Sequence, residues 1–437
     1  MKKVLILTYY WPPSGGSGVQ RWMYFAKYLS LFGYEPLVVT VDEKYASYAN
    51  IDTKLLKHVE DIKVFKTKTF EPLKLYSLIT SGSAKSGIPQ GGVSNEKASF
   101  IKKTASYIRG NYFIPDARKG WGSYAFKAAE KVIREHNIDT IITTGPPHST
   151  HLVGLKLKNK YNVKWIADLR DPWSNIYYNN NFYRTEKSKE KDRDLERQVL
   201  ENTDINLTVG IKLKELLADL YPINPDKFRH IYNGYDSDLM QSIQPEAQPH
   251  FEMTFIGLLT EHQPYQSIIE TIKQFLETET HPIIKLCIAG RISPDIIKAF
   301  ENISDKIQVI NKGYITHQDA VQLMANSNCL LNCLAEMENS EILISGKQME
   351  YVSTGNPVLC FGNTKGESAL ILNQLDNACM VEKEDIVTAS TFLKNLYFQW
   401  KNGHSIKNDT SSEFIQSKSR INTTKKLAEI LNELTKR

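Results

Sequence analysis

Short apolar runs alternate with amphipathic stretches along the first half of the chain. Residues 18–31 place Trp22, Phe25, Ala26 and Leu29 on one face of a helix. The apolar runs have the length of buried strands and lie at residues 3–8, 36–41, 140–144 and 164–168. Strands that alternate with helices predict a parallel, doubly wound sheet.

The second half of the chain repeats this pattern. Its predicted strands are residues 253–256, 284–289, 308–310, Cys329–Cys333 and 357–361, and its predicted helices are residues 267–276, 318–325 and 347–353. We therefore predict an α/β chain of two Rossmann-like domains, with ligands bound at the carboxyl ends of the strands, in the cleft between the halves.

The predicted domains are residues 1–235 and residues 236–415. A C-terminal helix, residues 416–437, follows them, and packing back onto the first domain is one option for it. A Ser- and Gly-rich stretch at residues 80–98 interrupts the first domain and predicts a mobile excursion.

Composition places the chain among water-soluble globular proteins, with 41% hydrophobic and 24% charged residues. No apolar run reaches the roughly 18 residues of a transmembrane helix. The apolar N-terminus runs into Tyr-Tyr-Trp-Pro-Pro without a small-residue cleavage site, so it predicts a buried strand and a cytoplasmic protein. The five cysteines match no metal or redox spacing and are interpreted as buried free thiols.

Charge divides unevenly between the two halves. Residues 1–235 contain 36 basic and 24 acidic side chains, whereas the rest of the chain contains 18 and 25. An anionic partner of the first half, such as a membrane surface, an acidic lipid-linked acceptor or nucleic acid, would fit this asymmetry. A generally solvated basic face is the alternative.

A glycine-rich loop joins the first predicted strand to the first helix. In its sequence, Pro-Pro-Ser-Gly-Gly-Ser-Gly, Gly16 and Gly18 allow close approach of a ligand to the backbone and to the helix N-terminus. A dinucleotide fingerprint is the competing interpretation, since Asp42 ends the second strand. Arg21, however, occupies the place of the third glycine and disfavours NAD binding.

Two further motifs follow predicted strands of the first half. Thr-Thr-Gly-Pro-Pro-His places His148 at the carboxyl end of a strand, as a candidate base or a loop-stabilising histidine. Asp-Leu-Arg-Asp-Pro-Trp places Asp168, Arg170 and Asp171 where a strand enters a loop. These groups could orient sugar hydroxyls and stabilise developing charge, or they could form a structural ion pair that closes the loop.

The fourth motif is Ser-Gly-Lys-Gln-Met-Glu-Tyr in the second half, which opens a short helix. The carboxylate of Glu350 can accept hydrogen bonds from two ribose hydroxyls. Lys347, one turn earlier, can reach a diphosphate as a point charge, and Gly346 leaves room beside it.

In this order and spacing, the motifs resemble the family 4 glycosyltransferases, especially bacterial members that build surface polysaccharides. The resemblance covers nearly the whole chain. It also rests on residues 112–118, residues 233–236 and Gly355 with Pro357. It implies a GT-B fold, a UDP- or GDP-linked sugar donor as co-substrate, no cofactor or metal, and transfer with retention at the anomeric carbon.

The chain departs from this family in two places. Members commonly carry two acidic residues eight positions apart, but Ile342 stands at the first place, with Glu341 one residue away. Members also hold the diphosphate with an Arg and a Lys, where this chain has Leu258 and Gln263.

Other cations must then neutralise the diphosphate. The candidates for donor binding are the three glycines Gly16, Gly18 and Gly346, the cations Lys347, Arg21 and Arg291, the weaker cation His262, and Glu350. The candidates for catalysis are Asp168, Arg170, Asp171 and His148.

We expect a glycosyltransferase that moves a sugar from a nucleotide sugar to a hydroxyl of a glycan or lipid-linked acceptor. The alternatives are a nucleotide-sugar epimerase on the same fold and an inactive nucleotide-sugar-binding subunit of a polysaccharide-assembly complex. The expected anionic partner of the first half is the inner face of the plasma membrane rather than nucleic acid. Its expected contact is the basic and aromatic stretch 101–113.

Overall fold

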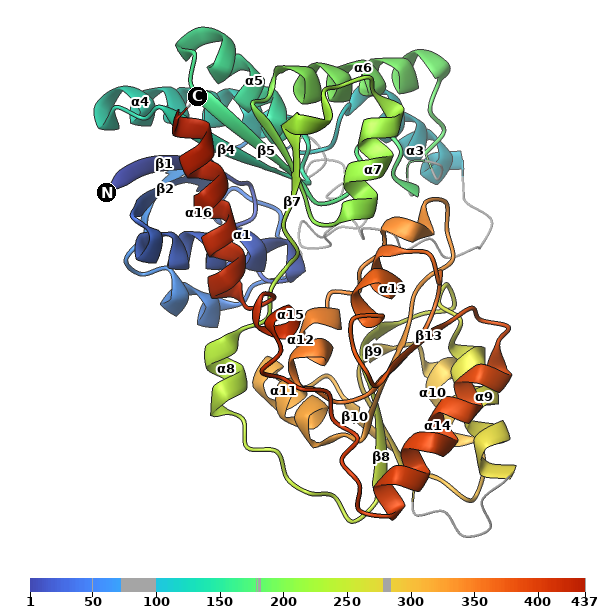
Figure 1. The fold of residues 1–437 in the computed structure, drawn as a ribbon. Helices are drawn as coiled ribbons and strands as arrows, with labels where there is room; N and C mark the ends of the chain where they lie inside the picture. Colours follow the sequence, from blue (N-terminus) through green and yellow to red (C-terminus); the bar gives the residue numbers. More distant parts are fainter. Residues whose placement is uncertain (49, 72–99, 178, 180–181, 278–283, 437) are drawn as a thin grey trace. The chain divides into compact units, whose positions relative to one another are not determined.

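The structure is a computed structural model that describes residues 1–48, 50–71, 100–177, 179, 182–277 and 284–436. The predicted excursion at residues 80–98 lies outside these residues. The chain divides into two compact units, each described by itself: Met1–Tyr232 with Thr423–Arg437, and Asn233–Asn422 (Figure 1).

The first unit is built on a parallel sheet of seven strands in the order β3-β2-β1-β4-β5-β6-β7. The strands are β1 Lys2–Leu7, β2 Tyr34–Val41, β3 Lys63–Thr67, β4 Thr140–Gly145, β5 Lys164–Leu169, β6 Ile205–Thr208 and β7 Phe228–His230. Strand β1 is an inner strand between β2 and β4, and its residues from Val4 to Leu7 are completely buried. A continuous apolar run is what a parallel strand covered on both faces requires.

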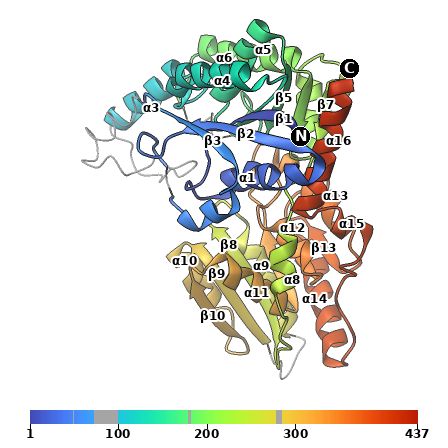
Figure 2. The same cartoon turned by 90° about the vertical axis from the view of Figure 1, so that its left-hand side faces the viewer.

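Helices cover both faces of this sheet. They are α1 Ser17–Leu29, α3 Phe100–Tyr112, α4 Gly122–His136, α5 Ser149–Tyr161, α6 Glu186–Asn202, α7 Ile211–Leu220 and α16 Arg420–Lys436. Helices α4, α5 and α6 lie on one face, and α1 lies on the other (Figure 2). Asn137 and Asn162 end α4 and α5 in the left-handed conformation, at φ 53° and φ 50°.

The C-terminal helix α16 packs on the first unit. The hydroxyl of Tyr34 donates a 2.9 Å hydrogen bond to the side chain of Asn432. The ammonium of Lys2 donates to the hydroxyl of Thr435 at 3.1 Å. The first unit is therefore completed by residues nearly four hundred positions from its first strands.

The second unit has a parallel sheet of six strands in the order β10-β9-β8-β11-β12-β13. The strands are β8 Phe251–Leu259, β9 Ile284–Ile292, β10 Gln308–Gly313, β11 Cys329–Cys333, β12 Val358–Phe361 and β13 Ala378–Val381. The helices are α8 Ser237–Ser242, α9 Tyr265–Glu277, α10 Pro294–Glu301, α11 His317–Asn326, α12 Gln348–Ser353, α13 Glu367–Leu372, α14 Ile386–Lys401 and α15 Glu413–Gln416.

The main core of the second unit lies between this sheet and the helices α9, α10 and α14 (Figure 1). Tyr397 of α14 meets the rings of Phe251 and Phe275 edge-to-face, each at 5.6 Å between centroids. Aromatic pairs of this geometry add to the burial of their apolar area. Helix α11 packs on β8, and Val321 and Ala325 of α11 form a smaller cluster with Ile243.

The two predicted Rossmann-like parallel sheets are confirmed. Each predicted strand and helix has a counterpart, and the short or half-exposed strands β3, β6, β7 and β13 are additional to the prediction. The break between the units falls at Tyr232 rather than at residue 235. All five cysteines are free, and all but the half-buried Cys379 are buried.

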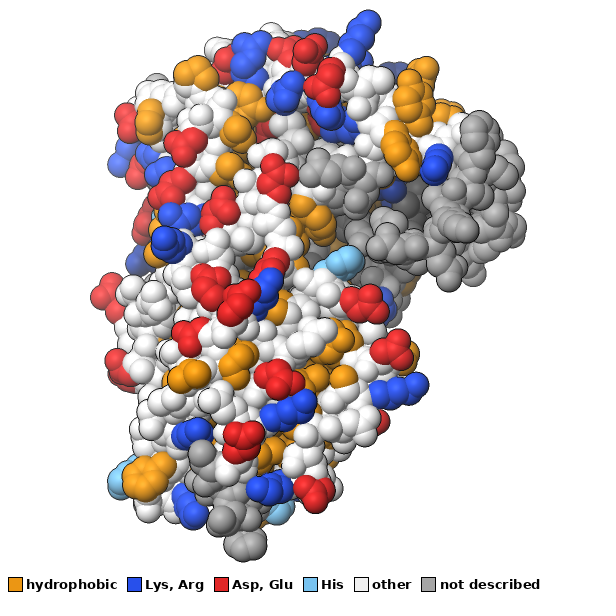
Figure 3. All heavy atoms as spheres, turned by 90° about the vertical axis from the view of Figure 1, so that its right-hand side faces the viewer, with side chains coloured by type: hydrophobic (Ala, Val, Ile, Leu, Met, Phe, Trp, Pro, Cys, Tyr) orange, Lys and Arg blue, Asp and Glu red, His pale blue; other side chains and the backbone are white. Residues whose placement is uncertain are grey.

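The surface carries charges of both signs. On the face drawn in Figure 3, Lys and Arg side chains alternate with Asp and Glu side chains rather than forming one field. Among the described residues, no helix combines the length and the apolar character needed to cross a membrane.

Candidate functional site

A buried ion pair closes the carboxyl end of β5 in the first unit. Asp168 has no solvent exposure and accepts hydrogen bonds from Arg21 at 2.9 Å, Trp22 at 2.6 Å and Thr144 at 2.9 Å. Arg21 also donates to the carbonyl of Ile231 at 2.8 Å. The geometry favours the structural ion pair over the ligand-binding roles predicted for Asp168 and Arg21.

Arg170 ties the glycine-rich loop region to the loop that follows β4. Its guanidinium donates to the carbonyls of Gly145 at 3.0 Å, Pro146 at 2.7 Å and Gly18 at 2.9 Å. A Cβ atom on Gly18 would lie 3.1 Å from Nη1 of Arg170. Gly16 has φ +98°, a conformation that favours glycine. Arg170 therefore holds these two loops together. All three of its hydrogen bonds go to backbone carbonyls, and none goes to the carboxylate of the next residue.

That carboxylate is Asp171, which is half-buried and has no hydrogen bond within the described part of the chain. Burial raises its pKa, and the neighbouring charge of Arg170 opposes this rise. Helix α6 holds the loop in place, since Glu196 accepts from the amides of Trp173 at 3.3 Å and Ser174 at 3.1 Å. Asp171 is thus a half-buried acceptor on a supported loop, without a hydrogen-bond donor among the described residues.

His148 lies buried under this loop. Its ring stacks on Trp173 at 5.1 Å between centroids and 9° between planes, and neither ring nitrogen finds a hydrogen-bond partner among the described residues. Burial holds its pKa well below the ordinary value, and it lowers that of His151 to about 3. His151 bonds Thr143 at 2.8 Å. A Cβ on Gly145 would come within 2.8 Å of both rings, so this position requires glycine.

Residues 112–118, which also carry the family resemblance, contact the helix that follows His148. Asp116 accepts hydrogen bonds from the amide of Ser149 at 2.7 Å and from its hydroxyl at 2.9 Å, at the first turn of α5. Arg118 pairs with the buried carboxylate of Glu71 at 2.5 Å. The first-turn amide is therefore satisfied from within the protein.

In the second unit, Lys347 is a half-buried cation at the carboxyl ends of the central strands. Its ammonium lies 3.5 Å from the ring centroid of Phe255, and a Cβ on Gly257 would be 3.7 Å from Nζ. No carboxylate of the described residues pairs with it. The ionisable groups that act on its pKa are the thiols of Cys333 and Cys360. Burial lowers its pKa to about 8. An anion from outside the chain would stabilise the charged form of an amine in this setting.

Glu350 lies on the short helix α12, and His317 meets it from α11. Nε2 of His317 and Oε1 of Glu350 are 2.6 Å apart, and the hydrogen bond to Glu350 raises the pKa of His317. His317 is not among the residues predicted from the sequence, because nothing in its local pattern at a helix start distinguishes it from a solvated residue.

The other predicted cations lie at the same edge of this sheet. Arg291 is exposed at the end of β9, with its guanidinium 5.6 Å from the ring centroid of Tyr314. His262 is exposed on the loop after β8, and Gly346 is exposed beside Lys347. These positions place Arg291 and Gly346 at the sheet edge without giving either a contact to Glu350.

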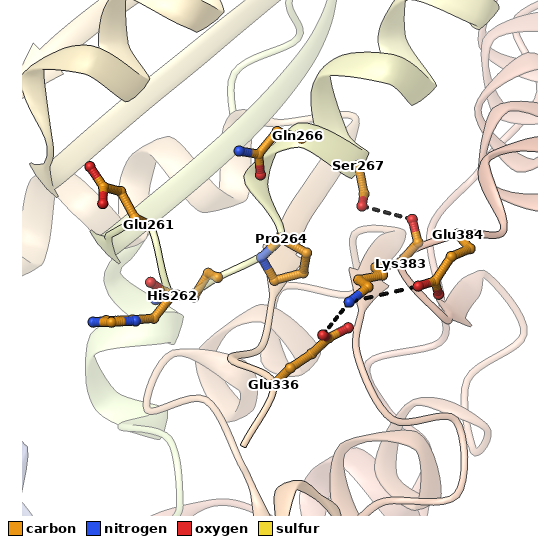
Figure 4. Close-up of a pocket in the computed structure, with 9 residues that line it drawn as sticks. Glu261, His262, Pro264, Gln266, Ser267, Glu336, Lys383 and Glu384 are labelled. Carbon is orange, nitrogen blue, oxygen red and sulfur yellow. Dashed lines mark hydrogen bonds and ion pairs between the residues drawn. The ribbon is translucent and has the colours of Figure 1, made fainter. Parts of the chain in front are cut away.

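A cavity of about 430 Å³ opens next to His262, beyond the ends of β8, β11 and β13. Figure 4 shows Lys383 pointing between Glu336 and Glu384, across from Pro264. The other residues that line the cavity are Glu261, Gln263, Gln266 and Ser267.

The two departures from the family pattern have structural consequences. Gln263 accepts from the amide and hydroxyl of Thr260 at 2.9 Å and 2.7 Å, so it closes the loop after β8. Leu258 is 61% exposed at the strand end, where the family has a cation. Glu341 lies in a 3₁₀ turn, Ser340–Ile342, and is half-buried. Among the predicted cations, Lys347 is therefore the half-buried one that has no carboxylate partner in the described structure.

Residues 93–239 match the model of Glycosyltransferase Family 4. This segment, about a third of the chain, includes the motifs around His148 and Arg170. The predicted resemblance to that family is confirmed there. No curated protein sequence matches the chain significantly.

Solved structures match the fold over the whole chain. A glycosyltransferase from Rickettsia africae superposes with a TM-score of 0.64 at 13% identity, over 100% of this chain and 99% of its own. HepE from Anabaena, in complex with UDP and glucose, gives 0.60 at 12%, over 99% and 100%. A proposed UDP-N-acetylglucosamine 2-epimerase from Listeria monocytogenes gives 0.52 at 14%, over 100% and 98%. The fold is GT-B.

Proposed function

We propose that this GT-B protein with a family 4 segment is a glycosyltransferase that moves a sugar from a nucleoside-diphosphate donor to a hydroxyl acceptor. In the reaction, the acceptor oxygen bonds the anomeric carbon while the bond from that carbon to the diphosphate oxygen breaks. The hydroxyl proton is released to water, and the diphosphate oxygen takes the electron pair of the broken bond and so gains negative charge. The main task of the protein is therefore electrostatic.

The observation that carries this proposal is the environment of Lys347. A cation without a carboxylate partner, packed on Phe255 and next to Gly257, fits an anionic ligand at the carboxyl edge of a parallel sheet. We assign the diphosphate to Lys347. The free oxygen of Glu350, three residues further along, would accept from ribose hydroxyls.

The first unit supplies candidates for binding sugar hydroxyls. Asp171 is an acceptor without a partner in the described structure, and His148 is a neutral ring with two unpaired nitrogens. A neutral imidazole can donate through one nitrogen and accept through the other. We propose that both contact hydroxyls, while Arg170 keeps their loops in place.

The test is the affinity of uridine diphosphate, measured by calorimetry. Lys347→Met should weaken binding roughly 10- to 100-fold, since one charged hydrogen bond is lost. Lys365→Met is the matched control, because Lys365 is exposed in the same unit. Equal binding by wild type and Lys347→Met would remove Lys347 from the site and the proposal would lose its basis.

An activity assay separates transfer from its alternatives. Uridine diphosphate sugars are incubated with and without a glycan or lipid-linked acceptor, and products are followed by mass spectrometry and NMR. Release that depends on the acceptor supports transfer. A changed sugar without any acceptor identifies an epimerase, and binding without turnover identifies an inactive subunit.

We further propose retention of the anomeric configuration and a role in polysaccharide synthesis, both supported by the family 4 resemblance. The anomeric coupling constant of the product tests retention. For the acceptor we propose a lipid-linked glycan at an anionic membrane, supported by the exposed aromatic and basic helix α3.

A further inference from the structure

The direction of the hydrogen bond between His317 and Glu350 follows from the charge of the carboxylate. An ionised carboxylate has no proton to donate, so Nε2 of His317 must carry the hydrogen of the 2.6 Å bond. The side chain of Glu350 is 15% exposed and that of His317 is 43% exposed. A partly solvated pair of this kind stabilises a fold only slightly.

Only one oxygen of Glu350 is used by this bond. Oε1 accepts from His317, whereas Oε2 has no hydrogen bond within the described part of the chain. The bond therefore fixes the rotation of the carboxylate and leaves a free acceptor. Two other charged groups act on His317, Arg420 and Asp236, and their effects on its pKa are opposite in sign.

We propose that His317 is a positioning residue for donor recognition. It holds Glu350 so that the free oxygen accepts from a ribose hydroxyl, which makes the site selective for ribonucleoside over 2′-deoxyribonucleoside diphosphates. This inference rests on the proposed function, because it requires a nucleoside diphosphate at the site.

The experiment compares the affinities of uridine diphosphate and its 2′-deoxy analogue by calorimetry. In wild type, the loss of the hydroxyl should weaken binding about 10-fold or more. In His317→Ala, the ratio of the two affinities should fall below about threefold, because Glu350 is no longer held. His317→Gln should restore the ratio, since the amide nitrogen can replace Nε2 as the donor.

His404→Ala is the matched control, as His404 is an exposed histidine of the same unit. It should keep the wild-type ratio. A merely structural His317 would weaken both nucleotides equally and leave the ratio unchanged, and this result would overturn the inference. If wild type binds uridine diphosphate through Lys347 but never discriminates the deoxy analogue, the positioning role of His317 and the contact of Glu350 with the 2′-hydroxyl fail, while the diphosphate site stands. If wild type binds neither nucleotide, the proposed function fails and the inference fails with it.

Discussion

Lys347 and Asp168 are opposite cases at the scale of single residues. Lys347 has no carboxylate partner in the described structure and a pKa lowered to about 8, whereas Asp168 is saturated by three donors. Burying either charge costs free energy, and the two residues differ in whether the protein supplies a partner that offsets this cost. The first is free to meet a ligand, and the second holds the fold.

Donor affinity should therefore depend on pH through Lys347. Below pH 8 its amine is protonated and attracts the diphosphate; above pH 8 the proton is lost, and affinity should fall. Calorimetry of uridine diphosphate across pH 6.5 to 9.5 measures this. Lys347→Arg is the control, because the guanidinium stays charged over this pH range. Ionisation of the ligand affects both proteins equally, so it cancels in the comparison of wild type with Lys347→Arg. A fall of the same size in Lys347→Arg would contradict this assignment.

Asp168→Asn should destabilise the first unit by about 3–5 kcal/mol, because it leaves the buried guanidinium of Arg21 without its counter-charge. Urea unfolding followed by tryptophan fluorescence suits this measurement, as five of the six tryptophans lie in that unit. Asp194→Asn, in an exposed pair, should leave the unfolding midpoint unchanged. If Asp168→Asn is harmless, the carboxylate is not needed by the fold and is available to a ligand.

At the scale of elements, helix α3 is the candidate for membrane contact. Tyr107 is 43% exposed, Ile108 is 42% exposed and Tyr112 is 66% exposed, and Lys103 is exposed on the same helix. Arg109 is partly withdrawn, with its guanidinium 4.6 Å from the ring centroid of Phe182. Exposed aromatic and basic side chains on one helix suit the interface of an anionic bilayer.

The protein should therefore co-sediment with phosphatidylglycerol vesicles at low salt and dissociate at high salt. Each basic residue near such a surface contributes about 1 kcal/mol, and salt screens it. The double variant Ile108→Ser, Tyr112→Ser should sediment less. Phe398→Ser, which removes an equally exposed aromatic residue from α14, should behave as wild type. Protein that stays in the supernatant at low salt would show that the basic excess of the first half is a solvated face.

At the scale of the whole molecule, a donor nucleotide should stabilise the folded chain by mass action. A ligand at 100 times its dissociation constant adds about 2.7 kcal/mol. Thermal denaturation with uridine, guanosine, cytidine and thymidine diphosphates should give a shift for the nucleotide of the true donor, and Lys347→Met should lose it. A panel in which every nucleotide leaves the melting temperature unchanged would count against a donor site.

The sequence alone determined most of the buried strands, the two-sheet architecture and the motifs that end strands. It could do so because burial imposes a local period on each element, as in the apolar run of β1 and the stripe on α1. The same local pattern placed Lys347 and Glu350 together, since both lie within one turn of α12.

Only the tertiary structure decided which side chains meet. Asp168 pairs with Arg21 across 147 positions of sequence, and Glu350 meets His317 across 33. The addition of α16 to the first unit is likewise non-local. No period within a segment encodes a contact between distant segments, because that contact depends on how the sheets and their helices pack. For this reason the sequence could name Asp168 as a candidate ligand, but only the fold shows that its oxygens are already occupied.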